Sequence, residues 1–302
     1  MLETAVRQII DAHHHFWDLD KNYHPWLCDS KPIAFRYGSY EAIRKNYSQA
    51  DYLNDARHFQ VQGSVYVETE WDSSDHEGEM KYVDALRQTQ RLPTVAVAHV
   101  RLDDADVKKK LEYQQSFSFV RSVRHKPRAN IRANETQPGG MMDSQWRQGF
   151  SALGALGLRF DLQTPWWHVH EATQLAKTFP NVPIIINHAG LPSNREEQAI
   201  QSWKKAMKAV SAVDQVTVKI SGIGLPAHKW TAESNSQVVL SLIEMFGVNR
   251  CMFASNFPVD SLCASFDDIF IGFETIVKDF SEVEKDALFR TNANRIYDMG
   301  LL

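Results

Sequence analysis

The stretch IIDAHHHFWDL, residues 9–19, places three consecutive histidines directly after a short apolar run. An apolar run of this length that is rich in isoleucine predicts a buried β-strand, here over residues 8–14. Because side chains alternate across a strand, we expect Asp11, His13 and His15 on one face and His14 on the other. The kind of sheet that surrounds this strand then decides what the histidines can do.

Seven further strand-like runs follow, and a helix-like segment comes after each of them. These runs are rich in valine, isoleucine and phenylalanine, and glycine or proline flanks several of them. The further predicted strands cover residues 63–69, 94–100, 119–125, 159–164, 183–189, 216–222 and 251–256. The predicted helices cover residues 48–59, 75–90, 104–115, 142–157, 168–179, 196–212, 235–247, 266–279 and 281–299. Ser48 and Ser281 each precede an acidic residue by three positions, which is typical of a helix N-cap.

Eight strand–helix units in 302 residues predict an α/β fold, a (β/α)8 TIM barrel that forms a single domain over residues 1–302. The alternative is an open, doubly wound sheet, but no G-x-G-x-x-G or Walker loop follows any predicted strand. Residues 16–47 are the longest irregular region. This region contains several aromatic side chains, Trp26 among them, and we expect it to lie over the mouth of the barrel.

Composition excludes several classes of protein. Hydrophobic residues make up 43% of the chain and charged residues 23%, as in ordinary globular domains. A net charge of −4 without a basic cluster does not predict nucleic-acid binding. No apolar run approaches the roughly 20 residues that span a membrane, and the N-terminus lacks a signal-peptide pattern. Three cysteines without paired spacing fit a reducing compartment. We therefore expect a cytoplasmic protein that acts on a small molecule, as a monomer or a homo-oligomer.

Polar side chains gather at the C-terminal ends of the predicted strands. In a TIM barrel these ends meet at the mouth, which carries the active site. The residues expected there are His13, His15, Glu68, Arg124, His125, Asp161, Gln163, Asn187, His188, Lys219, Ser221, Ser255 and Asn256. The His-x-His pair is the strongest signal, because two imidazoles two residues apart can converge on one ion. A structural alternative is that Lys219 is an ion-pair partner and that Arg124 neutralises Asp161.

Three of these segments resemble the amidohydrolase superfamily, in particular its amidohydrolase-2 branch of sugar-lactone and pyrone-dicarboxylate lactonases. They are IIDAHHHFWDL, IINHAG (185–190) and MFASNFPVD (252–260), and the resemblance continues to NANRIY at 292–297. It implies a (β/α)8 barrel and hydrolysis at the mouth, with His13, His15 and His188 as metal ligands. In VRSVRHK (120–126), Arg124 would hold a substrate carboxylate or a sugar oxygen, since its planar fork pairs two oxygens at once.

The sequence departs from this pattern at two places. The family usually has an aspartate on strand eight as metal ligand and general base, where this chain has Asn256. An amide cannot take a proton from water near neutral pH, although it can hold a water or a substrate by hydrogen bonds. On strand four, His125 is the only candidate for bridging two metals. We therefore do not expect a binuclear centre.

Two mechanisms stay open. Three imidazoles can hold one divalent metal, zinc first, and a bound water of pKa about 7 would then attack the substrate. In a metal-free mechanism, the histidines form an oxyanion hole, and Asp260, Asp161 or His125 activates the water. Asn256 would hold a water or the substrate in either case.

The resulting prediction is hydrolysis of a small carbohydrate-derived or dicarboxylic lactone. The predicted substrate-binding residues are Glu68, Arg124, His125, Asp161, Gln163, Lys219 and Trp26. Two alternatives remain: a metal-dependent decarboxylase of an aromatic or muconate-like acid, and a non-catalytic barrel that binds a small acid. Asn256 is the feature that suggests the non-catalytic alternative.

Overall fold

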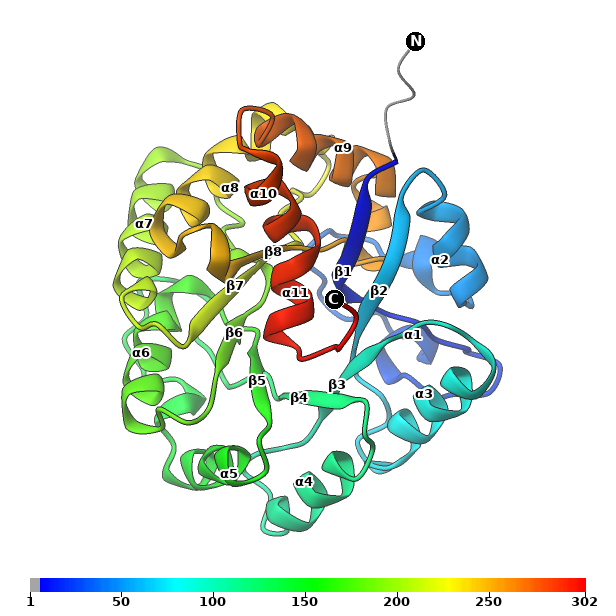
Figure 1. Cartoon of the computed structure of the whole chain (residues 1–302). Helices are drawn as coiled ribbons and strands as arrows, with labels where there is room; N and C mark the ends of the chain where they lie inside the picture. The colour runs from blue at the N-terminus through cyan, green and yellow to red at the C-terminus, as the bar shows by residue number, and fades with distance from the viewer. Residues whose placement is uncertain (1–5) are drawn as a thin grey trace.

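Eight parallel strands in consecutive order form the centre of the molecule, with helices around them (Figure 1). The structure is a computed structural model that describes residues 6–302. The strands are β1 (Gln8–His14), β2 (Gln60–Val67), β3 (Val95–His99), β4 (Val120–Arg124), β5 (Arg159–Leu162), β6 (Ile184–Ile186), β7 (Val216–Ile220) and β8 (Cys251–Phe253). The helices are α1 (Pro25–Cys28), α2 (Gln49–Asp55), α3 (Gly78–Thr89), α4 (Val107–Gln115), α5 (Ser144–Ala155), α6 (Val169–Thr178), α7 (Glu197–Ser211), α8 (Ala232–Phe246), α9 (Phe266–Ile276), α10 (Glu282–Asp286) and α11 (Asn292–Ile296). The predicted (β/α)8 barrel is confirmed.

The seam between β8 and β1 is closed by the residues that follow β8. Backbone hydrogen bonds run from Asn256 N to His13 O and from His15 N to Phe257 O, both at 2.8 Å. The backbone N–H of Ser255 donates to the Asp11 carboxylate at 2.9 Å. The barrel is thus nearly closed, and the segment after β8 lies directly beside the histidines of β1.

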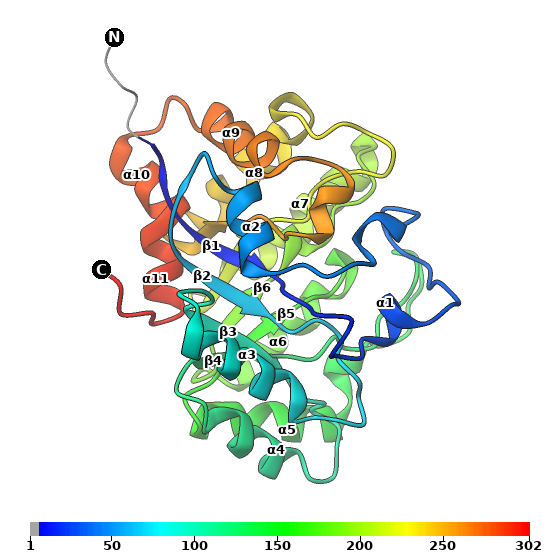
Figure 2. The same cartoon turned by 90° about the vertical axis from the view of Figure 1, so that its right-hand side faces the viewer.

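The barrel has an apolar filling that reaches only part of its length. Residues such as Ile10, Val65 and Met252 face inward and pack against Tyr297 just after α11. Figures 1 and 2 show α11 covering the end of the barrel where the strands begin. The opposite, C-terminal end is therefore the one that polar side chains can occupy.

A β-bulge in β1 changes the predicted alternation. The pairing of β1 with β2 shifts register between Asp11 and His14. Asp11 accepts a hydrogen bond from Tyr52 Oη of α2 at 2.9 Å, and the His14 ring packs on Tyr52 as well. The prediction that Asp11 shares a face with His13 and His15 is therefore wrong, because the extra residue of a bulge turns the strand.

Several predicted strands are longer than the observed ones. The chain turns sharply after β6 and β8, where His188 and Asn256 have left-handed backbones with φ of 53° and 56°. The capping boxes at Ser48–Asp51 and Ser281–Glu284 are both present. The helix predicted over 281–299 is instead α10, a π-helical turn at Ala287–Thr291 and α11.

The segment 16–47 extends over the C-terminal ends of the strands, as Figure 2 shows for α1. Trp26 of α1 stacks on Phe35 with ring centroids 5.7 Å apart. Across residues 6–302, no helix combines the length and the apolar character needed to cross a bilayer.

Candidate active site

A cavity of about 300 Å³ opens at the C-terminal end of the barrel, under the segment 16–47. Its wall combines side chains from six strand ends with aromatic and charged side chains of that segment. The lining residues are His15, Trp17, Trp26, Ile33, Ala34, Phe35, Arg36, Glu68, Thr69, Glu70, Arg124, Lys126, Gln163, His188, Leu191, Asn256 and Val259. The structure thus brings together seven residues that the sequence predicted for the site: His15, Trp26, Glu68, Arg124, Gln163, His188 and Asn256.

Three imidazoles cluster at the floor of this cavity: His15 and His188 line it, whereas His13 is fully buried beside them and does not. The ring of His13 lies 4.5 Å from that of His188 and 5.1 Å from that of His15, centroid to centroid. His15 Nδ1 donates to the backbone carbonyl of Val67 at 2.8 Å, so the neutral ring carries its lone pair on Nε2. His188 Nδ1 is 3.0 Å from Ser221 Oγ. In both rings Nε2 is the atom left for a ligand.

All three imidazoles are neutral at pH 7. Burial lowers the pKa of each, and the pKa of His15 falls to about 3. Neighbouring cations lower these pKa values further, chiefly Lys219 for His13 and Arg36 for His188. Neutral imidazole is the form that binds a metal or accepts a proton.

The donor set partly fits a divalent metal. Both ring nitrogens of His13 are buried, and within the described chain neither has a hydrogen-bond partner. The Val67 carbonyl fixes His15 in the manner of the outer-shell acceptors that orient metal-bound histidines. The arrangement fits less well, since residues 6–302 contain no group of three or more His, Cys, Asp or Glu side chains placed to hold a metal ion. The histidines therefore supply the donor type that a divalent metal takes, without a complete group of ligands among the described residues.

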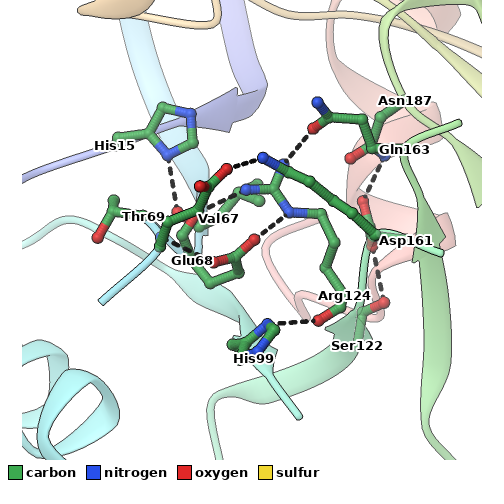
Figure 3. A network of polar contacts seen from close by, with 12 residues as sticks. His15, Val67, Glu68, Thr69, His99, Ser122, Arg124, Asp161, Gln163 and Asn187 are labelled. Atoms are coloured by element: carbon green, nitrogen blue, oxygen red, sulfur yellow. Dashed lines mark hydrogen bonds and ion pairs between the residues drawn. The ribbon is translucent and has the colours of Figure 1, made fainter. Parts of the chain in front are cut away.

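Arg124 is the central polar side chain of the wall (Figure 3). Its Nε donates to Glu68 Oε1, its NH2 group to the Glu68 backbone carbonyl at 2.7 Å, and its NH1 group to Gln163 Oε1 at 3.0 Å. Coulombic attraction to Arg124 holds the pKa of Glu68 at about 2 despite burial, which by itself would raise it. These bonds use three of the five N–H donors of the guanidinium, which leaves two for a substrate oxygen.

Asn256 is held by a second polar group behind the cavity. Its Nδ2 donates to Asp260 Oδ1 at 2.6 Å, and Tyr37 Oη donates to the same oxygen at 3.0 Å. Arg36 approaches this oxygen at 3.4 Å. Asp260 is buried and does not line the cavity, and burial raises its pKa. Asp260 was predicted as a base, but in the structure it orients Asn256 and Arg36 instead.

Asp161 and Lys219 lie below the cavity, and their predicted place in its wall is wrong. Lys219 Nζ is 2.7 Å from Asp161 Oδ1, and both side chains are 0% exposed. Tyr297 Oη donates to the two Asp161 oxygens at 2.8 and 2.9 Å, and Ser122 Oγ donates at 2.7 Å. The two residues do face the inside of the barrel as their alternation predicted. They lie one layer of side chains below the cavity, because β5 and β7 each continue beyond them toward the mouth.

His125 is also outside this cavity, contrary to the prediction. Its Nδ1 accepts hydrogen bonds from Leu102 N and from Trp146 Nε1, each at 3.0 Å. The ring therefore points to the outer side of the barrel wall, as alternation after Arg124 requires.

The sequence prediction missed three charged residues of the wall: Arg36, Glu70 and Lys126. Lys126 pairs with Glu70, and Arg36 NH1 donates to the Gly222 carbonyl at 3.2 Å. Arg36 belongs to a segment without periodicity, so its direction could not be deduced. The run R-H-K at 124–126 was a usable signal, because residues two apart on an extended chain share a side.

Three polar residues that line the cavity have left-handed backbone conformations. Glu70, His188 and Asn256 have φ values of 54°, 53° and 56°. Such conformations cost free energy for residues with a side chain, and they concentrate at functional sites. Here each of them turns a polar side chain into the cavity wall.

Comparison with known sequences finds one family over nearly all of the chain. The profile of a family described as "Amidohydrolase" matches residues 10–299. An uncharacterized protein, y4mH, of Sinorhizobium fredii is 38% identical over 295 residues, which cover 96% of this chain and 98% of the relative. An L-fucono-1,5-lactonase of Burkholderia ambifaria is 23% identical over 275 residues, covering 86% and 83%.

Solved structures show the same fold. An amidohydrolase of Burkholderia multivorans, crystallised once with bound zinc, superposes with a TM-score of 0.78 at 20% identity, over 96% of this chain and 99% of that one. A putative 2-pyrone-4,6-dicarboxylic acid hydrolase of Pseudomonas putida gives 0.68 at 20% identity, over 97% and 98%. A 2,6-dihydroxybenzoate decarboxylase of Rhizobium gives 0.60 at 14% identity, over 97% and 98%.

Proposed function

Because this chain belongs to the amidohydrolase family, we propose that it is a hydrolase that opens a small carbohydrate-derived or dicarboxylic lactone. The observation that carries the proposal is the cluster of three imidazoles beside Arg124, of which His15 and His188 line the cavity and His13 is buried against them. The similarity to L-fucono-1,5-lactonases supports the lactone class.

The charge of the cavity suits an acidic or polarised substrate. Arg36, Arg124 and Lys126 line it together with Glu68 and Glu70, which leaves one positive charge in excess. Attack of water on a lactone carbonyl develops a negative oxygen, and ring opening ends in a carboxylate. A preorganised cation at that oxygen stabilises the transition state more than the ground state.

The cavity residues have separate roles in binding the substrate and positioning the water. Arg124, fixed by Glu68 and Gln163, offers its two remaining N–H donors to the lactone carbonyl or to a substrate carboxylate. In the metal-free mechanism, the Nε2 lone pair of His15 can accept the proton of the attacking water. Asn256 holds that water in place. Trp26 and Phe35 cover the substrate from the side of the solvent and exclude bulk water.

A divalent metal is part of the proposal. His13, His15 and His188 would hold it, with Zn²⁺ the first candidate because neutral imidazoles suit this ion. Bound zinc would supply a water of lowered pKa. The zinc-containing structure of the Burkholderia multivorans relative supports this assignment.

Elemental analysis of protein purified without chelator tests the metal. We expect about one equivalent of a divalent metal per chain, loss of activity with a chelator, and recovery on adding Zn²⁺. Full activity of protein that contains no metal would exclude the metal-dependent mechanism. The imidazoles would then activate the water.

The substrate class is tested with a panel of 1,4- and 1,5-sugar lactones, 2-pyrone-4,6-dicarboxylate and hydroxybenzoic acids. A pH indicator reports the acid formed by lactone opening, and a parallel assay measures carbon dioxide. We expect acid without carbon dioxide. Carbon dioxide from an aromatic acid would favour the decarboxylase alternative, since the Rhizobium decarboxylase has the same fold. Ligand binding without any product over the whole panel would favour the non-catalytic barrel.

A further inference from the structure

A second cavity, of about 470 Å³, lies beside the first and shares a wall with it. Trp26, Ile33, Glu68, Glu70 and Lys126 line both cavities. The ion pair of Lys126 with Glu70 is part of this shared wall. A molecule bound in the first cavity can therefore extend into the second by passing the Lys126 and Glu70 side chains, which are partly exposed and carried on flexible stems.

Two histidines of the second cavity have fixed hydrogen-bonding roles. His125 Nδ1 accepts from Leu102 N and Trp146 Nε1, so the proton of this ring is on Nε2. Burial lowers the pKa of His125 to about 4, which keeps Nδ1 free of a second proton. His99 Nδ1 donates to the Arg124 carbonyl at 3.1 Å, which leaves Nε2 as the position where this ring can accept a hydrogen bond. One donor and one acceptor thus remain for a ligand, on rings whose centroids are 5.9 Å apart.

The charges of this second cavity balance, unlike those of the first. The three acidic and three basic residues in its lining are Asp29, Glu68, Glu70, Lys31, Arg101 and Lys126. Trp26 and Trp71 add two broad aromatic surfaces. Balanced charge does not select for an anion. Aromatic faces beside a paired donor and acceptor match a neutral ring that carries several hydroxyl groups.

We propose that the second cavity is a subsite for a neutral, polyhydroxylated ring, so that the substrate is a sugar lactone joined to a second sugar unit. This inference rests on the proposed lactonase function and names its substrate class. The lactone ring occupies the first cavity beside Arg124, and the second ring lies against Trp71 with hydroxyl groups on His125 and His99.

The first test compares disaccharide-derived 1,5-lactones, such as lactobiono-1,5-lactone, with the corresponding one-ring lactones. We expect kcat/KM to be at least tenfold higher for some two-ring lactones. Equal or lower values for every two-ring lactone would overturn the subsite while leaving the lactonase function intact. If no lactone is turned over, the test is thermal stabilisation: the increase in Tm with aldobionic acids is compared with the increase with one-ring aldonic acids. This measurement does not require catalysis. No greater stabilisation by any aldobionic acid would overturn the subsite as well.

Variants locate the effect in the second cavity. In His125→Asn, the amide oxygen can still accept from Leu102 N and Trp146 Nε1, but the Nε2–H donor is lost. Trp71→Ala removes the aromatic face, and Trp167→Ala is its control, a half-buried tryptophan outside both cavities. We expect KM for the two-ring lactone, or the dissociation constant of the aldobionic acid, to rise about fivefold to tenfold in the first two variants. One-ring lactones should change less than twofold, and equal losses on both substrate classes would refute the proposal.

Discussion

At the scale of the residue, Gly222 has a specific role because it lets two functional side chains approach the backbone after β7. A Cβ atom at this position would lie 2.6 Å from His188 Nδ1 and 2.7 Å from Arg36 NH2. The φ of Gly222 is also left-handed, at 59°. The absence of a side chain thus allows the Arg36 guanidinium and the His188 ring to share one corner of the cavity.

Gly222→Ala should therefore reduce activity much more than stability. We expect kcat/KM to fall about 100-fold, since displacing a catalytic group by about 1 Å can have that effect. The matched control is Gly157→Ala, where φ is 65° and a Cβ would meet nothing within 4 Å. Backbone strain should cost each variant about 1 kcal/mol of unfolding free energy, and Gly222→Ala should lose somewhat more because its Cβ also displaces His188 and Arg36; urea denaturation measures both losses. Equal activity of the two variants would contradict this role for Gly222.

Residue-scale prediction from sequence succeeded where alternation alone determined direction. Arg124 and Gln163 point into the barrel mouth as their strands predicted. His125 was also expected at the mouth, but it points outward, as alternation after Arg124 requires. The prediction failed where depth or a bulge mattered. Asp161 and Lys219 face inward but one layer below the cavity, and Asp11 turns outward at the bulge. The alternation of residues along the sequence predicts which side chains face inward. It does not predict how deep in the barrel a side chain lies or where a bulge inserts a residue.

At the scale of the element, the C-terminal segment is bonded to the middle of the barrel. Tyr297, just after α11, donates to both oxygens of Asp161, whose partner is Lys219 from β7. The cation of Lys219 also lies 5.0 Å from the centre of the Tyr297 ring. This buried group joins β5, β7 and the end of the chain directly beneath the histidines.

Removing one charge of this group should be costly. In Lys219→Met, Asp161 loses its cation inside the barrel, and we expect a loss of about 3–5 kcal/mol in unfolding free energy. The double variant Asp161→Asn/Lys219→Met should recover part of that loss, because no isolated charge remains. Urea denaturation of the two proteins measures the difference. A double variant that is less stable than the single one would show that the pair contributes more than charge compensation.

The order and approximate positions of the elements could be predicted, because eight apolar runs and their caps are local signals. A barrel could be predicted as well, but the bonds that close it could not. The seam depends on hydrogen bonds that Ser255 and Asn256 donate to Asp11 and His13, and on one that Phe257 accepts from His15. These residues are more than 200 positions apart in the chain. The cavity cover depends on residues 16–47, whose aromatic packing has no periodic pattern.

At the scale of the whole molecule, six histidines whose pKa values are lowered in the folded chain make stability depend on pH. Burial lowers the pKa of His13, His14, His15, His24, His125 and His188 in the folded chain. For His14 and His15 it falls to about 3, and for His24 and His125 to about 4. The unfolded chain, with histidines of pKa about 6.5, binds more protons below that pH. Their stabilisation is therefore complete above pH 6.5 and is lost as the pH falls.

We expect the unfolding free energy to decrease by several kcal/mol between pH 7.5 and pH 5, since each such histidine contributes up to about 1.4 kcal/mol per pH unit. Asp11, Glu79 and Asp260 act in the opposite sense, because burial raises their pKa values, that of Glu79 to about 7, but they are three groups against six. Urea denaturation at the two pH values measures the change. A protein that is equally stable or more stable at pH 5 would contradict the neutral, buried state of these rings.

The gathering of His13, His15 and His188 around one cavity is the feature on which the proposed hydrolase depends. The most direct measurement is kcat/KM of His188→Ala on the best lactone of the panel, beside His170→Ala, which removes an exposed imidazole outside that cavity. We predict a loss of at least 100-fold in His188→Ala, with retained folding, and less than a twofold change in His170→Ala. A folded His188→Ala protein with unchanged lactone turnover would contradict the account.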